Sequence, residues 1–158
     1  DLGPESMMTL DSRGRPINGE RGRPSMETGL HLHIYRLRAR VDAVIHTHAP
    51  ASIIAGLYNM KIPPLTVEMA RFSVVPLIPY HQPGSPELAF AVATALEKNP
   101  AAEAILLQNH GLVTMGKNLQ EAVNIAQAME EACRILILCR LLGGEPARIP
   151  GEPGRREI

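Results

Sequence analysis

The sequence predicts a single α/β domain in which strands and helices alternate along the chain. Its 158 residues are 45% hydrophobic, which is enough for one domain with a real core. Short apolar runs at 41–45 and 104–107 are typical of buried strands. Apolar residues spaced three and four apart predict helices at 86–98 and 119–142. These observations favour alternating elements around one core and do not by themselves fix the layer arrangement.

Composition narrows the possible partners and the compartment. Lys+Arg and Asp+Glu are 16 each, aromatic residues are 3% and Trp is absent, so we expect no nucleic-acid or membrane partner. Cys133 and Cys139 lie six apart in one helical pattern, on different sides of it, which predicts two core thiols rather than a disulfide. With no signal peptide and an apolar run at 135–142 interrupted by Arg140, we expect a cytoplasmic protein.

The N-terminal residues predict short extended segments followed by a helix. Residues 7–10 suggest a short strand, 11–14 a turn, and 15–23 a second strand or an exposed loop. A helix is expected from Pro24 to about Ala39, with Ser25 as its cap and Glu27 in its first turn.

The strand at 41–45 leads directly into His46 and His48. In an extended chain residues i and i+2 point to the same face, so both imidazoles should aim one way and Thr47 the other. Two neutral imidazoles on one rigid edge form half of a site for a first-row metal. The alternative is that two polar residues simply close a strand.

The middle of the chain shows clear start and stop signals. A helix is expected at 50–57, an extended segment at 62–65, and an edge strand at 74–80 because that strand contains prolines. Ser85 should cap the helix at 86–98, with proline at its first position.

The last third predicts two extended segments and a long helix. The strand at 104–107 is followed by an extended segment at 112–115. Asn118, with a glutamate three residues later, gives a capping-box-like start to the helix at 119–142, which Gly143 should end.

His110 is the third candidate metal ligand. It lies between a strand end and Gly111, where the backbone can turn sharply and leave the ring exposed. Alone, it could equally be a histidine that caps a turn. Together with His46 and His48 it would complete a set on loops that could converge at one sheet edge. Three histidines and an open position are the catalytic arrangement of zinc, and the same ligands would hold manganese, cobalt or iron.

Three residues of the helix at 24–39 are candidates beside the metal. Glu27 could bind the cation at rest and then act as acid/base, or it could be a surface glutamate that compensates the helix dipole. His31 lies four residues later on the same face and could hydrogen-bond to Glu27. Ser25, with the free N–H groups of the helix start, suits a phosphate.

These motifs together resemble the class II aldolase/adducin family. The resemblance rests on Pro24-Ser25-Met26-Glu27 with His31, on His46-Thr47-His48-Ala49-Pro50, and on Asn109-His110-Gly111 with Gly116-Lys117-Asn118-Leu119. It covers about residues 5–145. It implies one domain over 1–158, a three-layer α/β/α fold with a central mixed, largely antiparallel sheet. It also implies a ring-like homotetramer with the metal site near a subunit interface.

The resemblance also implies chemistry. His46, His48 and His110 match the family's zinc ligands, and Glu27 matches the acid/base of its aldolases, where the epimerases carry Asp. We therefore expect a metal-dependent aldolase-type lyase that acts on a sugar phosphate through a zinc-stabilised enediolate. Sugar-acid phosphate decarboxylase, methylthioribulose-phosphate dehydratase and ribulose-phosphate 4-epimerase activities are alternatives within the family. A non-catalytic adducin-like scaffold is the alternative from another class.

Three departures from the family pattern concern the substrate. The family's phosphate-binding Ser-Ser pair is Ser25-Met26 here, and its interfacial tyrosine has no counterpart near Val67–Glu68. By the same resemblance, we expect the given sequence to lack the family's N-terminal helix and first phosphate-contacting loops, which would precede Asp1. We expect the tail at 145–158 to be mobile or to lie along a neighbouring subunit.

Overall fold

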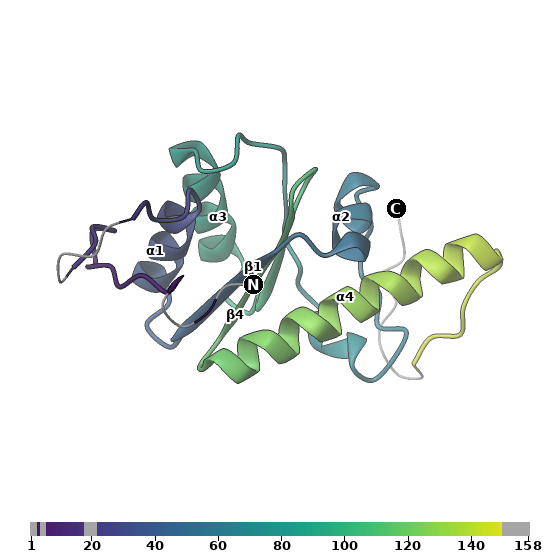
Figure 1. The fold of residues 1–158 in the computed structure, drawn as a ribbon. Coiled ribbons are helices and arrows are strands. Elements are labelled where there is room, and N and C mark those ends of the chain that lie inside the picture. The colour runs from purple at the N-terminus through teal and green to yellow at the C-terminus, as the bar shows by residue number, and fades with distance from the viewer. Residues whose placement is uncertain (1–2, 4–5, 18–21, 150–158) are drawn as a thin grey trace.

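The computed structural model describes residues 3, 6–17 and 22–149, and they form three layers. In Figure 1 helices α1 and α3 cover one face of a central sheet, and α2 and α4 cover the other. The elements in chain order are α1 (Thr28–Leu37), β1 (Ala43–Thr47), α2 (Pro50–Leu57), the 3₁₀ turn η2 (Met69–Phe72), β2 (Leu77–Ile78), α3 (Pro86–Lys98), β3 (Ala104–Leu107), β4 (Gly111–Gly116) and α4 (Leu119–Leu142).

The sheet has the order β1-β4-β3-β2. β4 pairs antiparallel with both β1 and β3, whereas β2 pairs parallel with β3. The expected three-layer fold with a mixed, largely antiparallel sheet is therefore confirmed. The edge strand expected at 74–80 is only Leu77–Ile78, because Pro76 and Pro79 flank this pair and have no N–H to donate to a ladder.

Alternation along the central strands divides the core between the two faces. Ile105, Leu107 and Val113 pack with the helices α1 and α3. Leu106 and Leu112 face the other way and pack with α2 and α4. All four residues of β3 and all six of β4 are buried, so these strands form the centre of the molecule and hold the turn between them in place.

Three of the expected helix starts are confirmed, two of them with the expected capping residue. Helices α2, α3 and α4 have the expected bounds. The Ser85 Oγ accepts a hydrogen bond from the Leu88 N–H at 3.1 Å, and the Asn118 Oδ1 accepts one from the Glu121 N–H at 2.8 Å. Gly143 follows α4 with a φ of 74°, the left-handed conformation typical of a glycine after a helix.

The first helix and strand begin later than expected. α1 starts at Thr28, so Glu27 occupies the cap position and not the first turn. Ser25 does not cap the helix; its Oγ accepts a hydrogen bond from the Glu27 N–H at 3.2 Å and closes a turn ahead of it. Helix α1 ends at Leu37, and β1 starts at Ala43, two residues later than the expected first residue of this strand.

Near the N-terminus the structure confirms the expected turn but not the expected strand. The turn at 11–14 is confirmed by the Gly14 N–H donating to the Asp11 carbonyl, but 7–10 form only one bridge, from Leu10 to Pro16. Residues 18–21 of the segment 15–23, and 150–158 of the tail, lie outside the described residues.

The two cysteines, Cys133 and Cys139, are free thiols. No helix in the described ranges has the length and apolarity to cross a bilayer.

Candidate active site

Three imidazole rings meet at the end of the sheet that carries the β3–β4 turn. His46 lies in β1, His48 directly follows β1, and His110 lies in that turn. The Nε2 atom of His46 is 3.1 Å from the Nε2 of His48 and 3.2 Å from that of His110. The structure thus brings together the three histidines that the sequence placed at separate strand ends, all within 4.8 Å of one another.

Hydrogen bonding and burial leave two of these rings, those of His46 and His110, ready to act as ligands. The His46 Nδ1 lies 3.0 Å from the Leu112 carbonyl, which can only accept, so the proton sits on Nδ1 and the Nε2 lone pair faces the cluster. Burial lowers the pKa of His46 and of His110 below the ordinary histidine value. Neutral imidazoles are therefore favoured near pH 7, as metal binding requires.

The spacing of the nitrogens fits a small divalent cation. Tetrahedral zinc holds imidazole nitrogens at about 2.0–2.1 Å, which places two of them about 3.4 Å apart. The observed 3.1 and 3.2 Å are close to that value. Within the described part of the chain the buried Glu27 Oε2 has no hydrogen-bond partner, and the other oxygen of this carboxylate lies near His110. A cation would satisfy both the converging lone pairs and this oxygen.

Close backbone approach explains the glycine after His110. A Cβ on Gly111 would lie 2.3 Å from the Thr47 carbonyl oxygen and 3.1 Å from the His48 ring, so a side chain here would push β1 away. The sharp turn expected of this glycine is made instead by Asn109, which has a φ of 58°. The glycine thus matters because it lets β4 lie directly beside the histidine pair.

Glu27 comes to the cluster from the start of α1. Its side chain is 11% exposed, which excludes the alternative of a dipole-compensating surface glutamate. One carboxylate oxygen, Oε1, accepts a hydrogen bond from the Gly84 N–H at 3.0 Å and lies 3.8 Å from the His110 Nε2. The carboxylate is therefore held at the edge of the histidine cluster by a loop from a distant part of the chain.

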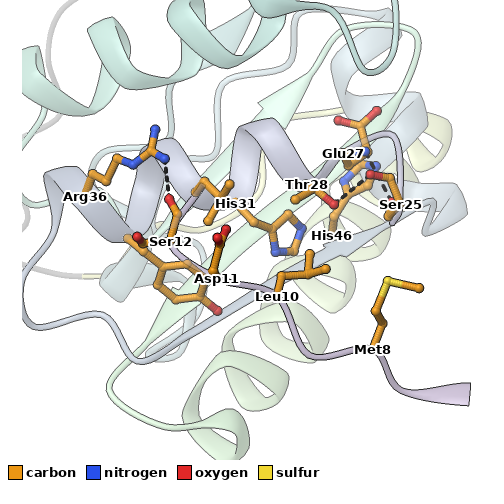
Figure 2. A pocket seen from close by; sticks show the side chains of 12 residues that line it. Met8, Leu10, Asp11, Ser12, Ser25, Glu27, Thr28, His31, Arg36 and His46 are labelled. Carbon is orange, nitrogen blue, oxygen red and sulfur yellow. Dashed lines mark hydrogen bonds between the residues drawn. The ribbon is translucent and has the colours of Figure 1, made fainter. Parts of the chain in front are cut away.

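A pocket of about 810 Å³ opens beside Glu27 and His46. Figure 2 shows Ser25, Glu27 and His46 gathered at one end of it, with Arg36 near the other. His31 lines the pocket between them. Its pKa lies below the ordinary histidine value, because the lowering by burial outweighs the raising by the Glu27 charge. The His31 N–H donates to the Glu27 backbone carbonyl at 3.2 Å, but among the described residues no hydrogen bond joins the two side chains, so the link between imidazole and carboxylate is electrostatic.

Two contributors to this site were not identified from the sequence. Gly84 donates its N–H to Glu27, and the only signal for it was the loop motif Pro83-Gly84-Ser85. Glu130 of α4 accepts hydrogen bonds from the start of α2, directly after the histidine pair. Nothing in the sequence distinguishes it from the other glutamates of a long helix.

Comparison with known proteins is consistent with this geometry. Residues 1–137 match the model of the Class II Aldolase and Adducin N-terminal domain. The chain is 33% identical to a 5-methylthioribulose-1-phosphate/5-deoxyribulose-1-phosphate aldolase of Escherichia coli O45:K1 (strain S88 / ExPEC), over 86% of this chain and 62% of the relative. It is 34% identical to a 3-oxo-tetronate 4-phosphate decarboxylase of Escherichia coli O6:H1 (strain CFT073), over 94% of this chain and 69% of the relative.

A solved structure shows the same fold. An L-fuculose 1-phosphate aldolase superimposes with a TM-score of 0.83 at 31% identity, over 96% of this chain and 70% of the other. The chain thus spans about two thirds of the length of these relatives. The family match over most of the chain, the identities and the shared fold agree with the histidine motifs. The protein belongs to the class II aldolase and adducin N-terminal domain family.

Proposed function

We propose that this chain carries the catalytic site of a metal-dependent aldolase-type lyase whose substrate is a sugar phosphate. The observation that supports this most strongly is the convergence of three imidazole Nε2 atoms beside a buried carboxylate. In this proposal His46, His48 and His110 hold a divalent cation, with zinc as the first candidate and manganese, cobalt or iron as the others.

Glu27 is the proposed acid/base. When bound, the cation would supply positive charge that stabilises negative charge developing on a substrate carbonyl oxygen. The Gly84 N–H holds Oε1, which leaves Oε2 free to remove or return the proton next to that carbonyl. Among the described residues a single loop hydrogen bond holds the Glu27 carboxylate, and we propose that it moves between the cation and the substrate.

Ser25 and His31 are proposed to act on the substrate and on Glu27. Ser25 lines the pocket beside Glu27, and its hydroxyl proton remains available for a phosphate oxygen while its oxygen accepts from the Glu27 N–H. His31 is proposed to be an electrostatic partner of Glu27, since the Glu27 charge acts on the His31 imidazole. Both roles concern binding and electrostatics, and neither residue transfers the proton.

Alternatives remain in two classes. The decarboxylase relative is as similar to this chain as the aldolase relative, at 34% against 33% identity, so sequence similarity supports decarboxylase activity equally well. Dehydratase and epimerase activities are further alternatives within the family. A non-catalytic scaffold is disfavoured because it would not need a buried carboxylate facing three histidines.

We further propose a homotetramer located in the cytoplasm. The end of α4 exposes Leu138, Leu141 and Leu142, with 85% of Leu142 accessible, and such a row would be covered in an oligomer. Two free thiols fit a reducing compartment. Light scattering of the full-length protein tests the assembly.

The decisive experiment combines metal analysis with a reaction assay. The full-length protein, loaded with Zn²⁺, is incubated with dihydroxyacetone phosphate and a panel of aldehydes, and C–C bond formation is followed. We expect product formation that is abolished by chelator. A zinc-loaded protein without aldol product would favour the decarboxylase or dehydratase, whereas a protein that takes up no metal would support the scaffold.

A further inference from the structure

Helix α2 begins without a cap of its own. Its cap residue, Ala49, has no side chain that can accept a hydrogen bond, so the first N–H groups of the helix need another acceptor. The Glu130 carboxylate of α4 supplies it, accepting from the Ala51 N–H at 2.8 Å, the Ser52 N–H at 2.8 Å and the Ser52 hydroxyl at 2.7 Å. A cap that comes from a different helix links α2 to α4, and the two pack side by side in Figure 1.

These contacts are of a strong kind. A carboxylate that accepts from backbone N–H groups at a helix start makes charge-assisted hydrogen bonds and opposes the positive end of the helix dipole. Ser52 is fully buried, so its hydroxyl has no water to turn to if Glu130 is removed. Glu131 on the same helix is different: its side chain is 59% exposed and forms an ion pair with Arg134 on the same helix.

His48 depends on where α2 begins. The β1–β4 ladder ends with Thr47 opposite Leu112, so His48 lies beyond the sheet hydrogen bonds. Only Ala49 separates it from Pro50, the first residue of α2. Unlike His46, whose Nδ1 is fixed by a backbone carbonyl, His48 is exposed and has no such hydrogen bond from its other ring nitrogen among the described residues. Its position is therefore set by the strand on one side and by the helix start on the other.

We propose that Glu130 is a positioning residue for the metal centre: by fixing the start of α2 it holds the His48 imidazole beside those of His46 and His110. Glu130 lies on the α4 side of the sheet; among the described residues its hydrogen bonds go to Ala51 and Ser52 and not to the histidines, and it does not line the pocket of Figure 2. This inference rests on the proposed metal site. It gives α4, on one face of the sheet (Figure 1), a role in a metal centre whose pocket opens on the α1 side.

The test is a titration of the metal-free full-length protein with Co²⁺, followed by the visible absorption of the bound ion. Residues that orient a metal ligand typically change affinity by about 10–100-fold when removed, so Glu130→Ala should lose about that much and alter the Co²⁺ spectrum. Glu130→Gln keeps one acceptor oxygen and should lose less. Glu131→Ala, one position along the same helix, should bind like the parent protein.

A second control separates positioning from general loss of stability. The guanidinium of Arg38, the residue directly after α1, donates to the Leu96 and Asn99 carbonyls at 2.9 Å and so caps the end of α3, at the opposite end of α1 from Glu27. Arg38→Ala removes a cross-helix cap of the same kind and should lower the urea midpoint without changing Co²⁺ affinity.

The outcomes are distinguishable. Parent protein that binds no Co²⁺ overturns the metal site itself and this inference with it. Parent protein that binds, with Glu130→Ala and Glu130→Gln binding equally well, overturns only the role of Glu130. Equal losses of affinity in Arg38→Ala and Glu130→Ala would also overturn it, because the effect would then follow stability alone. If Glu130→Ala does not fold, Glu130→Gln alone carries the comparison with Glu131→Gln.

Discussion

The candidate site has two halves that are held in different ways. The histidine half, made of His46, His48 and His110, is built on the ends of buried strands and on the turn between β3 and β4. The carboxylate half, made of Glu27 and Gly84, joins a helix start to a loop. In the histidine half, the β1–β4 ladder and the Leu112 carbonyl fix the His46 ring, and the His110 backbone is held by its N–H, which donates to the Leu107 carbonyl. In the carboxylate half, one hydrogen bond holds one of two oxygens.

This difference suggests a division of labour. A cation needs ligands that stay within a few tenths of an ångström, which strands can supply. A proton-transfer group must move between partners, and a residue at a helix start with one free oxygen can do so. We therefore expect changes in the histidine half to abolish metal binding and turnover together, and changes in the carboxylate half to affect turnover while metal stays bound.

Removing a ligand should have the largest effect. His46→Ala or His110→Ala leaves two imidazoles, and we expect purified protein with no stoichiometric zinc and turnover at background. Metal content by mass spectrometry and turnover in the same preparation test this. A variant that keeps one zinc per chain would show that the histidine half is not the metal site.

Glu27→Gln should separate the halves most clearly. Gln keeps the shape and can still accept from the Gly84 N–H, but it cannot take a proton. Loss of a positioned acid/base costs about 10²–10⁴-fold in turnover, and we expect a kcat loss in that range with zinc content unchanged. Steady-state kinetics beside metal analysis provide the measurement. Undiminished kcat would remove Glu27 from the proton transfer.

Gly84→Ala should perturb the carboxylate half through the backbone. Gly84 has a φ of 75°, and a Cβ there would lie 2.9 Å from the Met26 Cβ, so the loop must shift. We expect a loss of about 1–3 kcal/mol in the free energy of unfolding and a lower kcat with zinc retained, because the shifted loop moves the backbone N–H at position 84 away from the Glu27 oxygen.

Gly29→Ala is the matched control for that change. Gly29 lies in α1, two residues after Glu27, and a Cβ there meets nothing within 4 Å. A glycine replaced by alanine inside a helix gains about 0.5–1 kcal/mol, so this variant should unfold at higher urea and keep its kcat. If Gly29→Ala lowers kcat as much as Gly84→Ala, the loop hydrogen bond is not what positions Glu27.

The smallest effect concerns the packing that supports the histidine half. Burial raises the pKa of the Cys133 thiol to about 12, against the lowering effect of the Ser52 hydroxyl. Because the folded-state pKa lies above the unfolded value, this thiol contributes stability that is present below about pH 8.5 and is lost as the pH rises toward 12. A thiol reagent at pH 8 should therefore leave Cys133 unmodified until the protein is unfolded. Rapid modification of Cys133 in folded protein, located by peptide mapping, would contradict this.

Local sequence signals predicted much of the fold. Helices α2, α3 and α4 have the bounds expected from Pro50, from Ser85 and from Asn118, because proline and capping side chains act within a few residues of one another. Signals of this kind failed at α1, where Ser25 hydrogen-bonds to the Glu27 N–H and closes a turn instead of capping a helix. These signals also overestimated the length of β2, which has only two residues because prolines flank it.

By itself, the sequence determined that His46 and His48 share a face, since the period of a strand is two residues and needs no partner. Only the tertiary structure decided that His110, Glu27, Gly84 and Glu130 belong to the same place. Their contacts join residues 46 to 110, 84 to 27 and 130 to 52, and no local pattern encodes the pairing of strands and helices that brings such distant positions together. That pairing follows from burying both faces of one sheet, which is a property of the whole chain.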